Sequence, residues 1–93
     1  MLTFYHVFVS GQVQGVGYRA WTRDEALELG LKGWVRNLSD RRVEALLCGQ
    51  KSQIEQMLIA MESGPILSKV TGITQEEVQS NQEFETFSVE KSG

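Results

Sequence analysis

Two spacings of apolar residues run along the chain, and they predict different elements. Residues 3–10 are rich in aromatic and β-branched side chains, which is typical of a buried central strand. Residues 18–29 carry core-type side chains at steps of three and four, which predicts an amphipathic helix that Gly30 ends. The helix face expected to meet the core consists of Tyr18, Thr22, Ala26 and Leu29.

The middle of the chain predicts an antiparallel hairpin. Residues 31–38 and 43–48 each suit a strand, and the polar residues 37–42 suit the turn between them. The two-residue period of a strand places three residues of the first strand on one face, namely Gly33, Val35 and Asn37.

A second helix follows, with clear signals at both ends. Ser52 and Glu55 have the spacing of a capping box, and Gly64 followed by Pro65 is expected to end the helix. Its apolar stripe consists of Ile54, Met57, Leu58 and Met61. We interpret the methionines of this stripe as core residues and not as ligands.

The last part of the chain is expected to complete one sheet. Residues 70–74 suit a strand, the polar and acidic residues 74–82 suit a strand extension or a loop, and residues 84–89 suit a closing strand. The order strand–helix–strand–strand–helix–strand is satisfied by an antiparallel sheet with two helices on one face. The predicted fold is a ferredoxin-like α+β sandwich (βαββαβ), as a single domain over residues 1–93.

Three glycines lie within seven residues between the first strand and the first helix. Gly11, Gly15 and Gly17 can adopt positive φ and leave backbone amides uncovered, and amides that open onto a helix N-terminus bind anions. Arg19 adds a permanent positive charge in the first helical turn. The stretch predicts an oxyanion cradle, with phosphate as the expected ligand.

Other interpretations of the same glycines compete with the cradle. They could form only a tight turn, with Arg19 in solvent. Gly15, Gly17 and Ala20 also fit the loose dinucleotide-binding pattern, but the two strands that follow in quick succession do not suit a Rossmann domain. The P-loop pattern fails because no Gly-Lys-Ser/Thr follows the glycines.

Composition and charge make some classes of function less suitable than others for this chain. The 93 residues carry a net charge of −3, with six Lys/Arg against five Asp/Glu in residues 1–46 and three against seven in residues 47–93. This balance disfavours nucleic-acid binding. Cys48 is the sole cysteine, so no internal disulfide can form. We find no signal peptide and no membrane-spanning stretch, and we expect a monomeric cytoplasmic protein that does not bind membranes.

Few side chains suit covalent or metal-assisted catalysis. His6 is the only histidine, and as a strand residue it is expected to be structural or solvated. No His, Cys and carboxylate cluster has metal-ligand spacing, so we predict no metal site and no cofactor. The cradle suits hydrolysis of a phosphate with a good leaving group, such as an acyl phosphate. This reaction needs only groups that bind the phosphoryl oxygens and a positioned water. Asn37 is the candidate for positioning that water.

Two stretches resemble the signature pair of the acylphosphatase family. They are Val13-Gln14-Gly15-Val16-Gly17-Tyr18-Arg19 and Leu29-Gly30-Leu31-x-Gly33-Trp34-Val35-Arg36-Asn37. The resemblance implies a ferredoxin-like fold and hydrolysis of acyl phosphates to a carboxylate and inorganic phosphate, without metal or cofactor. It implies that Arg19 binds the phosphate and that Asn37 orients the attacking water. The implied phosphate-binding loop consists of Gln14, Gly15, Val16, Gly17, Tyr18 and Arg19.

One position departs from the family pattern, and one alternative function stays open. Similar members usually carry Asp-Gly in the hairpin turn, where this chain has Asp40-Arg41. If that turn requires positive φ, Arg41 costs about 1 kcal/mol relative to glycine. The alternative to an enzyme is a non-catalytic module on the same fold that binds phosphate or another anion, or a protein partner.

Overall fold

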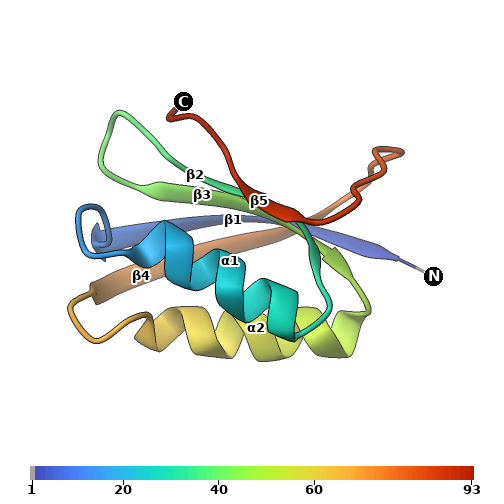
Figure 1. Cartoon of the computed structure of the whole chain (residues 1–93), viewed down its shortest axis with the longest axis horizontal. Coiled ribbons are helices and arrows are strands. Elements are labelled where there is room, and N and C mark those ends of the chain that lie inside the picture. The colour runs from blue at the N-terminus through green and yellow to red at the C-terminus, as the bar shows by residue number, and fades with distance from the viewer. Residues whose placement is uncertain (1) are drawn as a thin grey trace.

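The protein folds as a five-stranded sheet with two helices packed on one of its faces (Figure 1). The structure, a computed structural model, describes residues 2–93; the predicted domain starts at Met1, which lies outside the described residues. The elements are β1 (Thr3–Gln12), α1 (Tyr18–Glu28), β2 (Lys32–Asn37), β3 (Val43–Gly49), α2 (Lys51–Ser63), β4 (Lys69–Val78) and β5 (Phe87–Val89). Within residues 2–93, neither helix is long and apolar enough to cross a bilayer.

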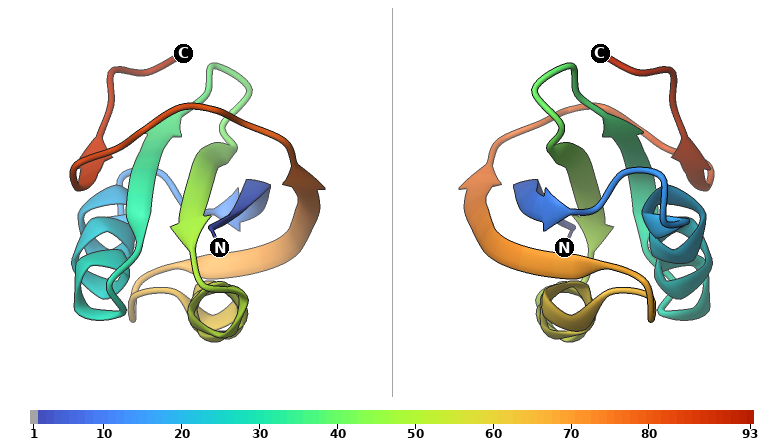
Figure 2. Two further views of the ribbon diagram at one scale, coloured as in Figure 1. Left: turned by 90° about the vertical axis from the view of Figure 1, so that its right-hand side faces the viewer. Right: turned by 90° about the vertical axis from the view of Figure 1, so that its left-hand side faces the viewer.

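The strand order β4-β1-β3-β2-β5 contains the predicted ferredoxin-like core and adds one strand to it. The first four strands pair antiparallel, as expected. β5 pairs parallel to β2, so the sheet is mixed and the prediction of a purely antiparallel sheet is corrected. Figure 2 shows the reason: the chain after β4 arches over the face opposite the helices and returns at the other edge of the sheet. A chain that reverses in this way runs along β2 in the same direction.

The boundaries of three elements differ from their predictions. β4 continues to Val78, which assigns most of the polar segment to the strand, and β5 begins only at Phe87. The predicted capping box of Ser52 and Glu55 is wrong. α2 begins at Lys51, and the Gln50 backbone N–H donates to Oε1 of Gln53 at 2.9 Å. Only Gln50, the N-cap residue, separates the helix from β3, which extends to Gly49.

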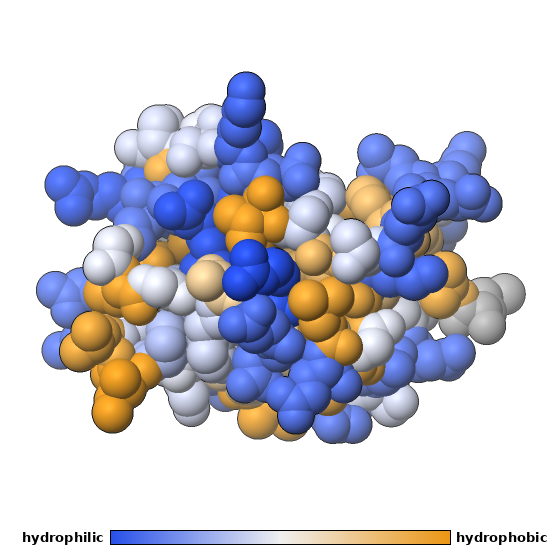
Figure 3. Space-filling view, in the orientation of Figure 1, coloured by the Kyte–Doolittle hydropathy of each residue, from blue (hydrophilic) through white to orange (hydrophobic). Residues whose placement is uncertain are grey.

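The main core lies between the sheet and the helices, and its residues follow the predicted periods. Tyr18, Thr22 and Ala26 are the buried residues of α1, and Met57 and Met61 of α2 are fully buried, as expected. The largest apolar exposures lie elsewhere. Ile66 and Leu67, which follow α2, are exposed. Figure 3 shows apolar residues in patches among the polar ones on the face of the molecule that it draws.

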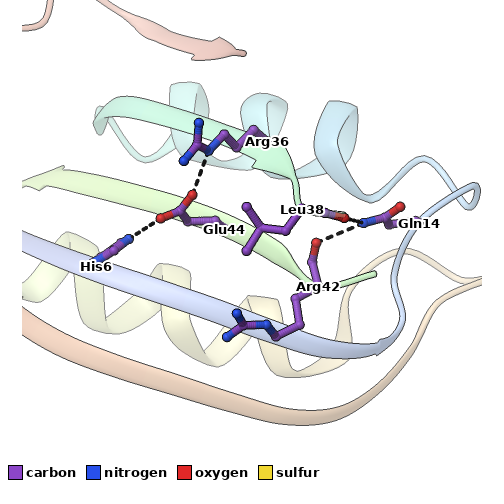
Figure 4. A network of polar contacts seen from close by, with 6 residues as sticks. All are labelled: His6, Gln14, Arg36, Leu38, Arg42 and Glu44. Atoms are coloured by element: carbon purple, nitrogen blue, oxygen red, sulfur yellow. Dashed lines mark hydrogen bonds and ion pairs between the residues drawn. The ribbon is translucent and has the colours of Figure 1, made fainter. Parts of the chain in front are cut away.

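The opposite face of the sheet carries a polar cluster centred on Glu44. The Glu44 carboxylate accepts from His6 Nε2 and from Arg36 Nε, each at 2.6 Å (Figure 4). Burial alone would raise the pKa of Glu44, but the bonds from Arg36 and His6 outweigh it and hold the pKa below its usual value. The sole histidine therefore holds a buried carboxylate, consistent with the structural role expected for it.

The β2–β3 turn does require positive φ. Arg41 has φ 77° and is the only non-glycine residue with positive φ in the described chain. The turn is closed by the Leu38 N–H, which donates to the Arg42 carbonyl at 2.8 Å, and by the Arg41 N–H, which donates to the Leu38 carbonyl at 3.2 Å. Arg41 thus occupies a conformation that glycine adopts at lower cost.

Replacing Arg41 with glycine is therefore expected to stabilise the protein by about 1 kcal/mol, because glycine has no Cβ to clash at positive φ. Urea unfolding followed by tryptophan fluorescence measures this change. The matched control is Arg42→Gly, which relieves no positive φ and removes a side-chain bond to Asp40. We expect this control to destabilise. An Arg41→Gly variant that unfolds at lower urea than the wild type would contradict the account of the turn.

Candidate functional site

The loop between β1 and α1 presents backbone amides at a helix N-terminus. Gly15 and Gly17 have φ of 75° and 78°, so both adopt the left-handed conformation that glycine favours. Gly17 is the N-cap residue of α1, and no side chain in the described chain caps this end. The helical hydrogen bonds start with the Trp21 N–H, which donates to the Gly17 carbonyl at 3.0 Å. The amides of residues 18–20 precede that bond and are available to an anion.

A cavity of about 260 Å³ lies beside these amides. It is bordered by the glycine loop, the first turns of α1 and β5, through Val13, Gly15, Gly17, Tyr18, Arg19, Ala20, Arg23 and Val89. Two of these residues are arginines and none is acidic. Arg23 pairs with Asp24 at 3.1 Å, whereas Arg19 forms no ion pair with any residue from 2 to 93. The half-buried Arg19 is therefore the cation available to a ligand in this cavity.

Tyr18, predicted as part of the loop, has a structural side chain. It is buried, and its hydroxyl donates to the Met61 carbonyl at 2.7 Å, which anchors the start of α1 to the end of α2. Burial raises the pKa of this phenol, so the hydroxyl stays protonated. A Cβ at Gly64 would lie 2.7 Å from the Tyr18 ring, so only glycine fits beside it. Tyr18 can offer the ligand its backbone amide but not its hydroxyl.

Gln14 joins the loop to the β2–β3 hairpin. Its side-chain amide donates to the carbonyls of Leu38 and Arg42, both at 2.9 Å (Figure 4). The sequence placed Gln14 in the loop but gave no sign of this contact, because no spacing rule predicts carbonyl partners 24 and 28 residues away. The bonds hold the glycine loop against the end of β2.

Asn37, the last residue of β2, lies at that end and is followed directly by Leu38. Its Oδ1 atom is buried and has no hydrogen-bond partner among residues 2–93. Buried amide oxygens are almost always satisfied, so an unused one marks a place for a ligand or water hydrogen. Asn37 does not border the cavity of Arg19; the structure connects it to the loop through Leu38 and Gln14.

A second cavity, of about 270 Å³, adjoins the loop. Gln14 and Val16 border it together with Arg41 of the hairpin turn, and Val13 borders both cavities. The six predicted loop residues therefore border two different cavities. Four of them border the cavity of Arg19, and Gln14 and Val16 border the second cavity. Over residues 2–93, no three His, Cys, Asp or Glu residues are grouped so as to hold a metal ion.

The chain matches known proteins over nearly its whole length. The family model described as Acylphosphatase matches residues 5–89. A protein named Acylphosphatase from Alcanivorax borkumensis is 57% identical over 76 residues, which cover 82% of this chain and 83% of that protein. Another of the same name, from Burkholderia lata, is 48% identical over 83 residues, which cover 89% of this chain and 85% of the relative.

Solved structures agree with these relatives. An acylphosphatase from Coxiella burnetii superposes with a TM-score of 0.91 at 38% identity, covering 96% of this chain and 93% of that one. The acylphosphatase from Bacillus subtilis gives a TM-score of 0.90 at 39% identity, covering 96% of this chain and 98% of that one. With its family model, its relatives and its fold in agreement, the chain belongs to the acylphosphatase family.

Proposed function

We propose that the protein hydrolyses acyl phosphates to a carboxylate and inorganic phosphate, without a metal ion or cofactor. One observation carries the proposal: Gln14 joins the loop that borders a cationic, amide-lined cavity to the end of β2, where the buried Oδ1 of Asn37 has no hydrogen-bond partner among residues 2–93. The first part suits a phosphoryl group and the second suits a water molecule. The names of the relatives support the same reaction.

We assign phosphate binding to the loop between β1 and α1 and to Arg19. The amides of residues 15–19 and the guanidinium group would donate to the phosphoryl oxygens, whose negative charge the N-terminus of α1 also favours. Because Gly15, Gly17 and the Gln14 bonds fix the loop, these donors are in place before the substrate arrives. Such preorganised donors stabilise charge in the transition state without reorganisation.

We assign the positioning of the attacking water to Asn37. Its Oδ1 accepts a hydrogen from the water, whose oxygen attacks phosphorus in line with the acyl oxygen. The new P–O bond forms as the bond from phosphorus to the acyl oxygen breaks, and the electron pair leaves with the carboxylate. The conjugate acid of that carboxylate has a pKa of about 4, so no general acid is needed. The proton of the water passes to a phosphate oxygen.

The setting we propose is a monomer in the cytoplasm that acts on a small molecule and binds no nucleic acid. The net charge of −3 and the acidic C-terminal half oppose nucleic-acid binding. Cys48 is a buried free thiol, which suits a reducing compartment.

Replacing Asn37 with alanine is expected to lower kcat for benzoyl phosphate by about 100-fold or more, because the water loses its acceptor. The affinity for inorganic phosphate should stay close to that of the wild type. Hydrolysis assays in excess EDTA and phosphate titrations measure the two effects. Asn81→Ala, at an exposed position far along the chain, is the matched control. Near-full activity of Asn37→Ala would remove Asn37 from the mechanism, and a wild type that binds phosphate without hydrolysing the substrate would favour the binding-module alternative.

Replacing Arg19 with glutamine is expected to abolish the thermal stabilisation that bound phosphate gives the folded protein. A ligand that binds only the folded state raises the melting temperature, so millimolar phosphate should raise the Tm of the wild type. The Arg19→Gln variant should show no such rise, because the cavity loses its unpaired cation. Arg42→Gln removes an equal charge whose partner is Asp40 and should keep the rise. Equal phosphate protection in Arg19→Gln and in the wild type would place the anion site elsewhere.

A further inference from the structure

The cavity of Arg19 is bordered by a second arginine, Arg23. The two residues stand four positions apart on α1, so they lie on the same face of the helix, with Arg23 about 6 Å further along the axis. Both residues are half-buried, and the lining of the cavity contains no acidic residue. Two cations therefore border one space, at different distances from the amides of the helix N-terminus.

The cavity is larger than a phosphoryl group alone requires. Its volume of about 260 Å³ approaches that of pockets that hold whole small molecules, a range that begins at about 300 Å³. The lining continues past the N-terminus of α1 to Arg23 and to Val89 of β5, a strand that lies beside α1 (Figure 2). With the phosphoryl group at the amides of residues 18–20, the part of the cavity beside Arg23 is left for the acyl oxygens.

The ion pair of Arg23 leaves most of its guanidinium group free. Its Nε donates to Oδ1 of Asp24 at 3.1 Å, and its Nη atoms form no hydrogen bond with any residue from 2 to 93. The side chains of Arg23 and Asp24 are 41% and 68% exposed, and such an exposed pair contributes about 0–1 kcal/mol. Because a guanidinium group has five N–H donors, Arg23 can donate to a ligand without losing a strong bond.

We propose that Arg23 is a further catalytic residue, which donates hydrogen bonds to the acyl oxygen of the leaving group as negative charge develops on it. The inference rests on the proposed hydrolysis of acyl phosphates and deepens it. When the bond from phosphorus to the acyl oxygen breaks, the electron pair stays on that oxygen, so a cation beside it stabilises the transition state more than the bound substrate. Arginine stays protonated in proteins, so no proton is transferred and the leaving group departs as a carboxylate.

The test compares acetyl phosphate with chloroacetyl phosphate, whose leaving carboxylate is the weaker base. Arg23→Gln is expected to lower kcat for acetyl phosphate by about five- to tenfold, the effect of a charge-assisted bond at a partly exposed site. The loss for chloroacetyl phosphate should be about half as large, because a weaker base depends less on stabilisation of its charge. KM and the rise in Tm with inorganic phosphate should stay close to those of the wild type, because Arg23 acts in the transition state.

Two matched variants control for charge and for structure. Lys51→Gln removes an equal charge at the exposed first residue of α2, outside the cavity lining, and should keep the wild-type kcat for both substrates. Asp24→Asn removes the ion-pair partner of Arg23 but keeps the guanidinium group, so it should keep or raise kcat.

An unchanged kcat in Arg23→Gln would overturn the proposal, and so would a fall of equal size for the two substrates. Loss of the phosphate-induced rise in Tm would also overturn it, because Arg23 would then bind the phosphoryl group. An equal fall of kcat in Asp24→Asn would contradict it by assigning the effect to the ion pair. A wild type that hydrolyses neither substrate would instead overturn the proposed function, and the role of Arg23 with it.

Discussion

The site depends on one side-chain amide, that of Gln14. Its two donors are both used, on the Leu38 and Arg42 carbonyls, and these same carbonyls accept the backbone bonds that close the β2–β3 turn. Gln14 therefore fixes the glycine loop to the most constrained point of the hairpin. Without these bonds the positions of the loop and of the end of β2 would be independent, and the proposed anion site and the proposed water site could not act on one substrate.

The rest of the fold keeps both partners of this contact rigid. Tyr18 anchors the start of α1 to the end of α2 through its hydroxyl. On the hairpin side, β2 approaches β3 so closely at Gly33 that a Cβ there would lie 1.9 Å from the Leu46 carbonyl oxygen. In the proposed mechanism, donors fixed on both sides stabilise the phosphoryl transition state by electrostatics and position, which is what a reaction with a good leaving group requires.

Local pattern predicted most of the elements, and long-range contacts decided what it missed. The steps of three and four placed Tyr18 and Met57 in the core correctly because burial follows the helical period. The direction of β5 depends on the path of residues 79–86 over the sheet, which no period encodes. The start of α2 escaped prediction because a glutamine pair can take the place of the usual capping residues.

The sequence indicated which residues belong to the candidate site but not the contacts that bring them together. The glycines, Arg19 and Asn37 were identified from residue type and from the family resemblance. The roles that the resemblance implies for these residues stay predictions. The contact of Gln14 with two distant carbonyls depends on three-dimensional packing, and so does the burial of the Asn37 Oδ1 atom, which has no hydrogen-bond partner within residues 2–93. In the proposed mechanism, water attacks phosphorus and not the acyl carbon. Turnover of benzoyl phosphate in ¹⁸O-labelled water, with products analysed by mass spectrometry, tests this most directly: the account predicts the label in inorganic phosphate, and label in benzoate would contradict it.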